Sequence, residues 1–258
     1  MTPAALRRER EWCLSGPDLL CAPPAPLAAV WAGVRHAAGE TLPAPHSRLG
    51  RRFEQHWAWA LRRHPDWTVH AVDRQIRHAR ITLGAPDLLV SGPGGVWHIE
   101  LAVKFYLCRQ GLDGADPASW HGPGRNDRLD RKLHRLSTHQ LPLLGHPAAQ
   151  RWLSDSGFPT PTLRFGLFKG VLFSHWRKPT AGPGTSPPAG RWCHLRDLTA
   201  AVTRARVLSR QMWLGNTDNT PFLTGHALLS TVKQSIQDNS NTQLLTDTHR
   251  WFVMPDDW

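Results

Sequence analysis

The stretch LGAPDLLVSGPGGVWHIELAVKFYL, residues 83–107, decides the predicted fold. Two apolar runs meet at the turn GPGG, residues 92–95, and this pattern predicts a β-hairpin. Between residues 96 and 107 every second side chain is apolar, so one face of this strand is expected to be buried. The opposite face carries Glu100 and Lys104 in mid-strand. Partly buried charges are unfavourable unless a partner or an ion compensates them, so the pair indicates a functional site.

Length and charge limit the classes of protein. The chain has 258 residues, which suits one large domain or two small ones. Lys and Arg number 31 against 20 Asp and Glu, a formal charge of +11 before any of the 15 histidines ionises. Such an excess favours a polyanionic partner, with nucleic acid ahead of an anionic membrane. Arg-rich codon usage in a GC-rich genome would give the same balance, so charge speaks to association and not to fold.

Cysteine spacing and hydropathy bear on the compartment. The four cysteines are widely spaced and form no C-x-x-C pair, which fits a reduced compartment and argues against a disulfide framework or a structural zinc site. No apolar run reaches the roughly 18 residues of a membrane span, and the N-terminus lacks a signal-peptide core. The sequence therefore predicts a cytoplasmic protein without a membrane partner.

Composition divides the chain into four segments. They are an N-terminal arm packed on the core (1–46), an α/β core (47–178), a Pro/Gly-rich loop (179–190) and a C-terminal extension that completes the domain or forms a small lobe (191–258). The arm is rich in Pro and is expected to be irregular, apart from one helix between Leu27 and Ala38.

Two helices and several strands are expected in the core. Ser47 is a candidate cap for a helix that Pro65 would end, and Asn126 is expected to open a second helix with Asp127 in its first turn. A loop is expected at residues 111–123. Strands are expected at 67–80, 83–90 and 96–107, as an antiparallel meander, and one or two more at 163–173. The extension is expected to contain helices at 195–214 and 223–236 and a short apolar segment at 251–254.

The first core helix carries one carboxylate at the edge of its apolar stripe. Glu54 lies beside Phe53 and Trp57, which belong to a stripe at helical spacing. Either this carboxylate serves a site, or it pairs on the helix surface with Arg51 or Arg62. The sequence leaves both open.

The second core helix carries a basic face. Its packing stripe consists of Leu129, Leu133 and Leu136. Four cationic residues recur at i, i+4, i+7 and i+11 on another face: Arg128, Lys132, Arg135 and His139. This face can follow a phosphate backbone or can simply be solvated, and both remain open.

Two carboxylates are expected to converge from neighbouring strands. Asp87 precedes one arm of the hairpin and Glu100 lies in the other. Oxygen ligands of this kind suit Mg²⁺ or Mn²⁺, and Glu54 could help to hold a second ion. Bound metal turns water into a nucleophile, and a nearby lysine can orient that water or counter developing charge. Alternatively, Asp87 caps the turn beside Pro86, and Glu100 pairs with Lys104 on a solvated strand face.

These residues resemble a known superfamily. Pro86-Asp87, Glu100 and Lys104, with Glu54 upstream, resemble the motif of the PD-(D/E)XK, or restriction-endonuclease-like, nucleases. The segments RLGRRFEQHW, GAPDLLV, WHIELAVKFYL and GPGRNDRLDRKLHRLSTHQL are similar to the bacterial domain-of-unknown-function family eighteen fifty-three, over roughly residues 47–145. The resemblance implies that the residues matching Asp87 and Glu100 bind metal, that the lysine assists attack and that Glu54 can join a metal site. Gln140 is similar to a glutamine of the exonuclease branches.

The spacing of the acid and the lysine departs from the superfamily pattern. Three residues separate Glu100 from Lys104 where the pattern has one. In a regular strand their Cα atoms then lie about 13 Å apart instead of about 6.6 Å. Lys104 would have to reach back, a bulge would have to shorten the gap, or Lys132 would have to take its place.

The resulting expectation is an α/β protein with a restriction-endonuclease-like core, a mixed central β-sheet flanked by helices. Its expected function is a Mg²⁺-dependent (or Mn²⁺-dependent) nuclease, with DNA ahead of RNA as substrate. The expected catalytic residues are Asp87, Glu100, Lys104 and Glu54, and the expected nucleic-acid contacts are Arg128, Lys132, Arg135, His139 and Gln140. The alternatives are an inactive nuclease-like module that binds nucleic acid or a protein, and a basic structural protein.

Other enzyme classes lack their motifs. There is no P-loop and no G-x-S-x-G nucleophile elbow in the chain. The His98-x-Glu100 pair begins a zinc-deaminase signature, but no Pro-Cys-x-x-Cys follows it.

Overall fold

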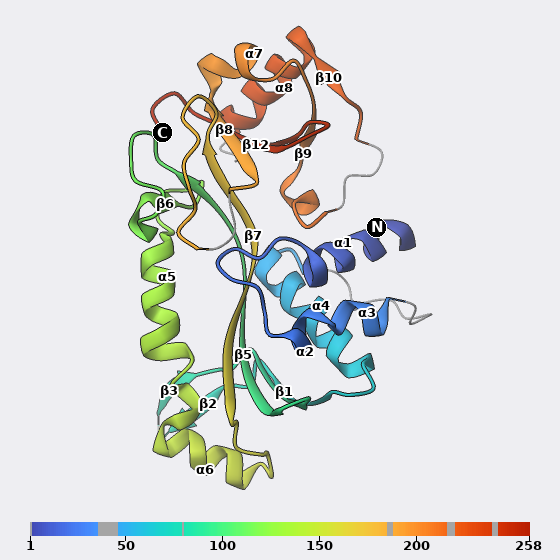
Figure 1. The fold of residues 1–258 in the computed structure, drawn as a ribbon, viewed down its shortest axis with the longest axis vertical. Coiled ribbons are helices and arrows are strands. Elements are labelled where there is room, and N and C mark those ends of the chain that lie inside the picture. The colour runs from blue at the N-terminus through green and yellow to red at the C-terminus, as the bar shows by residue number, and fades with distance from the viewer. Residues whose placement is uncertain (1, 36–45, 79, 185–187, 216–219, 239–241) are drawn as a thin grey trace.

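A mixed β-sheet runs through the length of the protein (Figure 1). The computed structural model describes residues 2–35, 46–78, 80–184, 188–215, 220–238 and 242–258. The sheet has ten strands, in the order β1 (Thr68–Val72), β4 (Leu88–Gly92), β5 (Gly95–Cys108), β7 (Leu163–His175), β8 (Gly190–His194), β12 (Arg250–Met254), β11 (Thr242–Leu245), β9 (Arg204–Leu208) and β10 (Leu223–Thr224), with β6 (Trp120–His121) beside the end of β5. The pairs β5–β7, β7–β8 and β8–β12 are parallel and the others are antiparallel. The predicted fold class, a mixed sheet flanked by helices, is confirmed.

The predicted hairpin forms at β4 and β5. Gly92 pairs with Gly95, so Pro93 and Gly94 alone make the turn. Gly94 has a φ of 88°, a conformation that favours glycine, and the ring of Pro93 fixes its own φ at the value the first turn position requires. β5 then pairs with β7 from Trp97 to Leu107. The predicted strands at 96–107 and 163–173 are therefore confirmed as one long parallel pair.

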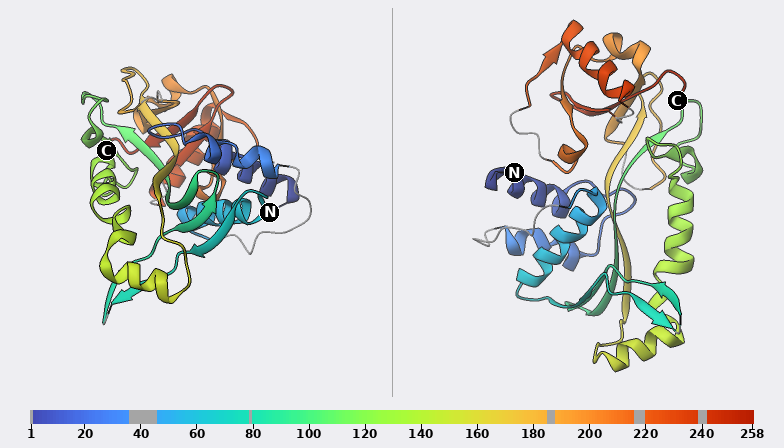
Figure 2. Two further views of the ribbon diagram at one scale, coloured as in Figure 1. Left: turned by 60° about the horizontal axis from the view of Figure 1, so that its bottom comes forward. Right: turned by 180° about the vertical axis from the view of Figure 1, so that it is seen from behind.

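Helices cover both faces of β5, α5 on one side and α4 with the N-terminal helices on the other (Figure 1; Figure 2, right). One face packs into the largest core cluster against Phe53 and Trp57 of α4 (Leu49–Arg63). The other face packs against α5 (Leu129–Arg135) through Tyr106 and Leu129. Glu100 is only 1 % exposed, so the alternative of a solvated strand face is wrong for this carboxylate.

The N-terminal arm is more regular than predicted. It begins with the helix α1 (Pro3–Ser15), whose N-cap Thr2 accepts a hydrogen bond from the amide of Ala5. The predicted helix at 27–38 forms as two short pieces, α2 (Ala25–Ala28) and α3 (Val30–Val34). Its last three residues lie outside the described residues.

The strands before the hairpin break where the backbone turns. The segment predicted as one strand at 67–80 splits into β1 and β2 (Ile76–His78), because Asp73 between them has a φ of 47°. Likewise β3 (Ile81–Gly84) ends at Gly84, with a φ of 154°, before β4 begins. β2 and β3 form a separate two-stranded ribbon.

The helix starts also differ from the predictions. The N-cap of α4 is Arg48 and not Ser47, and no side chain caps it. α5 begins at Leu129 because Asp127 lies outside the helix and accepts hydrogen bonds from Lys104 and Tyr106. After α5 come the π-helix η2 (Leu136–Gln140), η3 (Leu143–Gly145) and α6 (Pro147–Asp155), while the predicted loop at 111–123 contains η1 (Pro117–Ser119) and β6.

The C-terminal segment continues the sheet beyond β7. The helix predicted at 195–214 is wrong: after η4 (Leu195–Asp197) and α7 (Leu198–Ala201) the chain forms β9, which pairs with β10 and β11, and then η5 (Arg210–Met212). The helix predicted at 223–236 is α8 (Gly225–Gln237), and the apolar segment 251–254 lies in β12. All four cysteines are free. None of the described helices is long and apolar enough to cross a membrane.

Candidate active site

Carboxylates and cations share one open cavity beside β5. Its volume is about 450 Å³. The lining comes from α4, the start of β4, β5, the α5 region and the end of η2. The residues are Glu54, Asp87, Leu101, Lys104, Asn126, Asp127, Arg128, Arg131, Lys132, Arg135 and Gln140. A second cavity of about 770 Å³ continues along β5 and shares Leu101, Lys104, Asn126, Asp127 and Lys132 with the first.

Asp87 and Glu100 face each other across the hairpin. The register pairs Leu88 with Ile99, so the residues one step outward lie opposite each other. The backbone amide of Leu101 donates to Oδ2 of Asp87 (2.8 Å), and the amide of Asp87 approaches Oε1 of Glu100 (3.4 Å). The predicted convergence of these two carboxylates is thus a feature of the structure.

Two side chains bond to the carboxylate of Glu100, and a third is linked to it through one of them. Nε2 of His98 lies at hydrogen-bond distance from its Oε1 (2.8 Å). Nε2 of Gln140, at the end of η2, donates to its Oε2 (2.5 Å). Nζ of Lys132 on α5 donates in turn to Oε1 of Gln140 (2.7 Å). A hydrogen-bonded chain therefore links the lysine of the helix to the carboxylate of the strand.

The carboxylates crowd each other. Burial raises the pKa of Asp87 to about 8, and the nearby charges of Glu100 and Glu54 add to this effect, while the bond from Leu101 opposes it. Burial likewise raises the pKa of Glu54, against the opposing effect of its bond to Arg51. The carboxylate charge at the site is therefore incompletely compensated by the protein.

Lys132, and not Lys104, is the lysine that hydrogen bonds connect to these carboxylates. Lys104 lines the same cavity, but its Nζ pairs with Oδ2 of Asp127 (2.5 Å), and Oδ1 of the same carboxylate accepts a hydrogen bond from the phenol of Tyr106 (3.1 Å). Burial lowers the pKa of Lys132, as does Lys104, and the charges of Asp87 and Glu100 oppose the shift. The structure shows what accompanies the unusual spacing of Glu100 and Lys104. Lys104 on β5 is paired with Asp127, and α5 supplies the ammonium of Lys132 instead.

Glu54 reaches the cavity and also pairs on its own helix. Its carboxylate lies 2.8 Å from Nη1 of Arg51, which also contacts Asp73 at 2.6 Å. The pairing with Arg51 foreseen from the sequence therefore occurs together with the placement at the cavity.

The basic face of the second helix divides between two environments. Arg128, Lys132 and Arg135 line the cavity, and Arg128 also pairs with Asp130. His139 is exposed and is not among the lining residues, whereas Gln140 is.

Four functional positions were missed or misread from the sequence. Arg131 lines the cavity between Arg128 and Arg135, and its place within the basic run was the available signal. Asp127 was assigned to a helix start, and His98, buried beneath Glu100, was considered only as part of a deaminase motif. Lys132 was assigned to nucleic-acid binding, with a place at the carboxylates only as a substitute for Lys104. The partners of Asp127 and Lys132 come from other elements, which local sequence does not reveal.

The donors present fit a hard divalent cation that keeps most of its water. In the described part of the chain, no group of three or more His, Cys, Asp or Glu side chains is arranged to hold a metal. Mg²⁺ needs fewer protein ligands, because one or two carboxylates with several waters suffice. Asp87 meets this requirement, since among the described residues its Oδ1 has no hydrogen-bond partner, and Glu100 lies beside it. A cation would also offset the mutual repulsion of the carboxylates.

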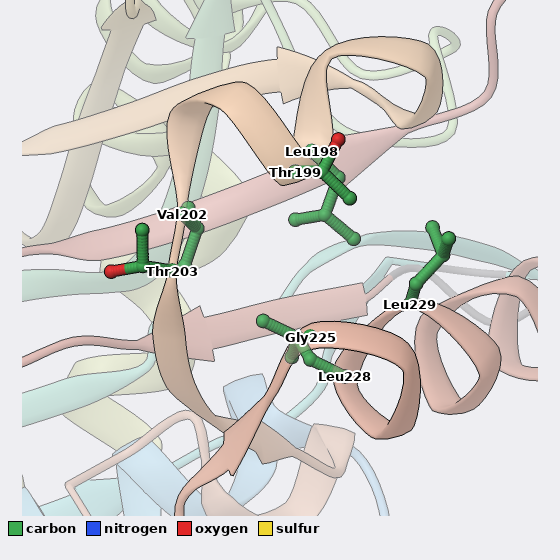
Figure 3. A pocket seen from close by; sticks show the side chains of 7 residues that line it. All are labelled: Leu198, Thr199, Val202, Thr203, Gly225, Leu228 and Leu229. Atoms are coloured by element: carbon green, nitrogen blue, oxygen red, sulfur yellow. The ribbon is translucent and has the colours of Figure 1, made fainter.

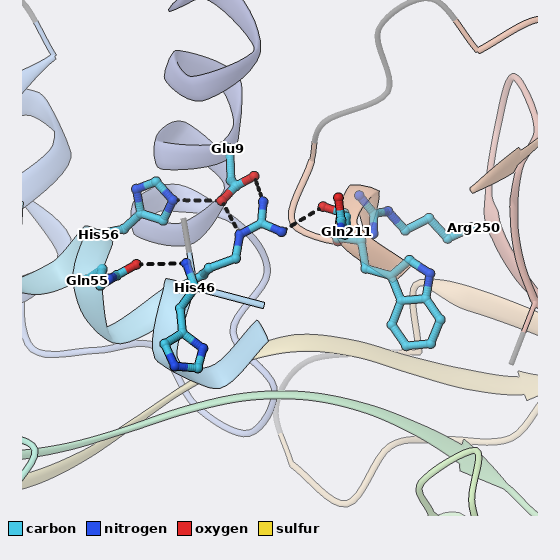
Figure 4. Close-up of polar contacts among 8 residues, drawn as sticks. Glu9, His46, Gln55, His56, Gln211 and Arg250 are labelled. Carbon is cyan, nitrogen blue, oxygen red and sulfur yellow. Dashed lines mark hydrogen bonds and ion pairs between the residues drawn. The ribbon is translucent and has the colours of Figure 1, made fainter. Parts of the chain in front are cut away.

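A buried charged cluster elsewhere is structural. Glu9 of α1 bonds to His56 at 2.9 Å and forms an ion pair with Arg52, which also donates to the carbonyl of Gln211 (Figure 4). Glu9, Arg52 and His56 are buried. They fasten α1 and η5 to α4.

A further pocket, between α7 and α8, is mainly apolar (Figure 3). It measures about 240 Å³. Its lining is Leu198, Thr199, Val202, Thr203, Gly225, Leu228 and Leu229, so it offers two hydroxyl side chains and no ionisable one. It holds none of the chemistry found beside β5.

The fold and the site together define a mixed α/β protein with a carboxylate pair at the base of a basic cavity. The chain belongs to the family described as Domain of unknown function (DUF1853), whose model matches residues 8–252. The predicted family is confirmed, over more of the chain than the sequence segments covered. No curated protein and no solved structure matches the chain.

Proposed function

We propose that this protein is a divalent-metal-dependent nuclease that hydrolyses phosphodiester bonds, with DNA ahead of RNA as substrate. One observation carries the proposal: Asp87, Glu54 and the cations of α5 line the same open cavity, with Glu100 buried beside Asp87. Cations alone would suit any polyanion. Carboxylates among them repel phosphate unless a metal ion lies between, and this combination is typical of phosphoryl-transfer sites.

Asp87 and Glu100 would hold Mg²⁺ or Mn²⁺, with Glu54 close enough to contribute. Bound there, the ion would lower the pKa of a coordinated water and neutralise charge on the phosphate. Asp87 must lose its proton before it can serve as a ligand. Because its pKa is raised to about 8, proton release accompanies metal binding.

The remaining residues of the cavity have separate roles in the proposal. Arg128, Arg131 and Arg135 bind and orient the phosphate backbone. Lys132, held by Gln140, counters the negative charge that develops at the reacting phosphate. Lys104 helps to shape the cavity through its pair with Asp127.

A second candidate is a nuclease-like module that binds nucleic acid without cleaving it. The engagement of Lys104 by Asp127 favours this reading, because the strand lysine of the resembled motif is then withheld from the carboxylates. Both candidate functions use the basic cavity, and they differ in whether the bound nucleic acid is cleaved.

The test is a cleavage assay on end-labelled single- and double-stranded DNA and RNA, in Mg²⁺, Mn²⁺ or EDTA. We expect cleavage in the presence of metal, its loss in EDTA, and its loss in Asp87→Asn and Glu100→Gln. Asp155→Asn, an exposed carboxylate at the end of α6, is the matched control and should cleave normally. Metal-dependent cleavage that survives Asp87→Asn would refute the site. Salt-sensitive binding without cleavage would favour the binding module.

A further inference from the structure

The β2–β3 ribbon presents a surface that packing does not explain. Ile81, at the start of β3, is 68 % exposed, the highest value among the large apolar side chains of the described residues. It pairs with His78 at the end of the ribbon. Arg77 and Arg80 flank this pair and are exposed. An apolar side chain surrounded by cations at the end of a ribbon points to a binding surface.

The base of the ribbon is fixed to the body. Ile76 is fully buried and belongs to a cluster with Leu143, Leu144 and residues of α6. Gly84, at the other end of the ribbon, approaches the side chain of Leu143. The free end extends away from the body (Figure 2, left). An anchored base and a projecting end allow the ribbon to enter a partner with little loss of its own order.

The charge of the ribbon is uncompensated. From Arg74 to Pro86 the sequence contains no acidic residue. Among the described residues, Arg74, Arg77 and Arg80 form no ion pair, and Arg77 bonds only to the side chain of Gln75 (3.3 Å). Because no described acidic residue of the chain pairs with these arginines, the surface is suited to bind a polyanion.

We propose that the β2–β3 ribbon is a wedge for duplex nucleic acid. Its arginines bind backbone phosphates, and Ile81 inserts between neighbouring base pairs and unstacks them, as apolar side chains do in proteins that kink DNA. The proposal rests on the nucleic-acid partner of the proposed function. Ile81 precedes Asp87 by six residues, a span of at most about 20 Å, so the unstacked step lies within about six base pairs of the carboxylates.

The test measures base unstacking without requiring cleavage. A DNA duplex carrying 2-aminopurine is titrated with the full chain in EDTA, because this base becomes more fluorescent when it leaves the stack. The expected result is a rise in fluorescence on binding. Ile81→Ser should keep the dissociation constant within about threefold and abolish most of the rise, since phosphate contacts dominate affinity. Leu112→Ser, an exposed leucine outside the ribbon, is the control and should keep the rise.

A second arm tests the arginines. The double variant Arg77→Ala/Arg80→Ala should lower the slope of log affinity against log salt by about 1.8, at about 0.9 for each lost phosphate contact. Arg151→Ala, exposed on α6, should leave the slope unchanged.

Three results would overturn the wedge. They are a fluorescence rise that Ile81→Ser retains, a salt slope that the double variant does not change, and binding of anionic phosphatidylserine vesicles, dependent on Ile81, in place of DNA. Cleavage of single-stranded DNA in Mg²⁺ is scored in parallel. If unstacking is absent but cleavage is intact, only the proposed role of the ribbon is refuted. If unstacking occurs without cleavage, only the proposed nuclease activity is refuted. If the protein does not bind DNA, both proposals are refuted.

Discussion

Replacing Asp87 by Asn should stabilise the metal-free protein at alkaline pH. The pKa of Asp87 is raised from an ordinary 3.8 to about 8 by burial and by Glu100. Below pH 4 both the folded and the unfolded state carry the proton. Above pH 4 the unfolded state releases it while the folded state holds it, so the free energy of unfolding falls as pH rises towards 8. Asn carries no such proton, and its side-chain oxygen can still accept the hydrogen bond from Leu101.

The size of the effect follows from the pKa. Between pH 5 and pH 8 the folded state binds close to one more proton than the unfolded state, and linkage gives about 1.4 kcal/mol for each pH unit. Over these three pH units the integral is about 4 kcal/mol. Asp87 keeps some contact with solvent and shares its proton with neighbouring carboxylates, so we expect a loss on the order of 2–4 kcal/mol relative to Asp87→Asn.

The assay is urea denaturation in EDTA at several pH values from 5 to 8. The free energies of unfolding of Asp87→Asn and wild type should differ least at pH 5, and the variant should be increasingly more stable towards pH 8. Asp155→Asn should follow the wild-type curve. Mg²⁺ at pH 8 should stabilise the wild type and not Asp87→Asn. Parallel curves for wild type and Asp87→Asn would refute the assigned electrostatics of the site.

Three further changes have defined outcomes. Lys132→Met should lower the cleavage rate by roughly 10²–10³-fold, and Lys104→Met by less than about tenfold, because Lys132 is linked through Gln140 to Glu100 whereas Lys104 is paired with Asp127. Gln140→Ala should weaken divalent-metal binding by about 10–100-fold, measured by calorimetry, because it orients Glu100. Arg52→Ala should destabilise the fold by about 3–5 kcal/mol in urea, since it leaves the carboxylate of Glu9 buried without its cation.

Each of these changes has a matched control and a contrary result. Gln237→Ala and Arg62→Ala replace exposed residues of the same types, and we expect changes within about 0.5 kcal/mol for both. Equal losses for the two lysine variants would contradict the assignment of Lys132. Unchanged metal affinity in Gln140→Ala would remove that residue from the site, and a stability change for Arg52→Ala no larger than for Arg62→Ala would show that the buried pair is dispensable.

The part of the site predicted from sequence is the part that local rules determine. A two-residue turn with alternating strands fixes the register, and the register sets Asp87 opposite Glu100. The approach of Lys132 depends on how α5 packs across β5, and the reach of Gln140 depends on the π-helix that follows it. The spacing of residues along the chain does not predict either position, because both depend on tertiary contacts.

The errors in the predicted secondary structure have a similar origin. The arm was expected to be irregular because it is rich in Pro, but its α1 forms a regular helix whose Glu9 is paired with Arg52 at 43 residues' separation in the chain. Residues 204–208 fit a helical pattern in isolation and form β9 because β10 and β11 pair with both its edges. Pairing across the chain overrode local preference in each case.

Calorimetric titration of Mn²⁺ at pH 8 into the wild type and Asp87→Asn tests the central claim most directly. At this pH Asp87 is about half ionised, against about 1 % at pH 6, so binding should be strong enough to measure and should weaken steeply on acidification. We predict saturable binding to the wild type and to Asp155→Asn, and none to Asp87→Asn. Saturable binding that persists unchanged in Asp87→Asn, or its absence from the wild type, would contradict the metal site.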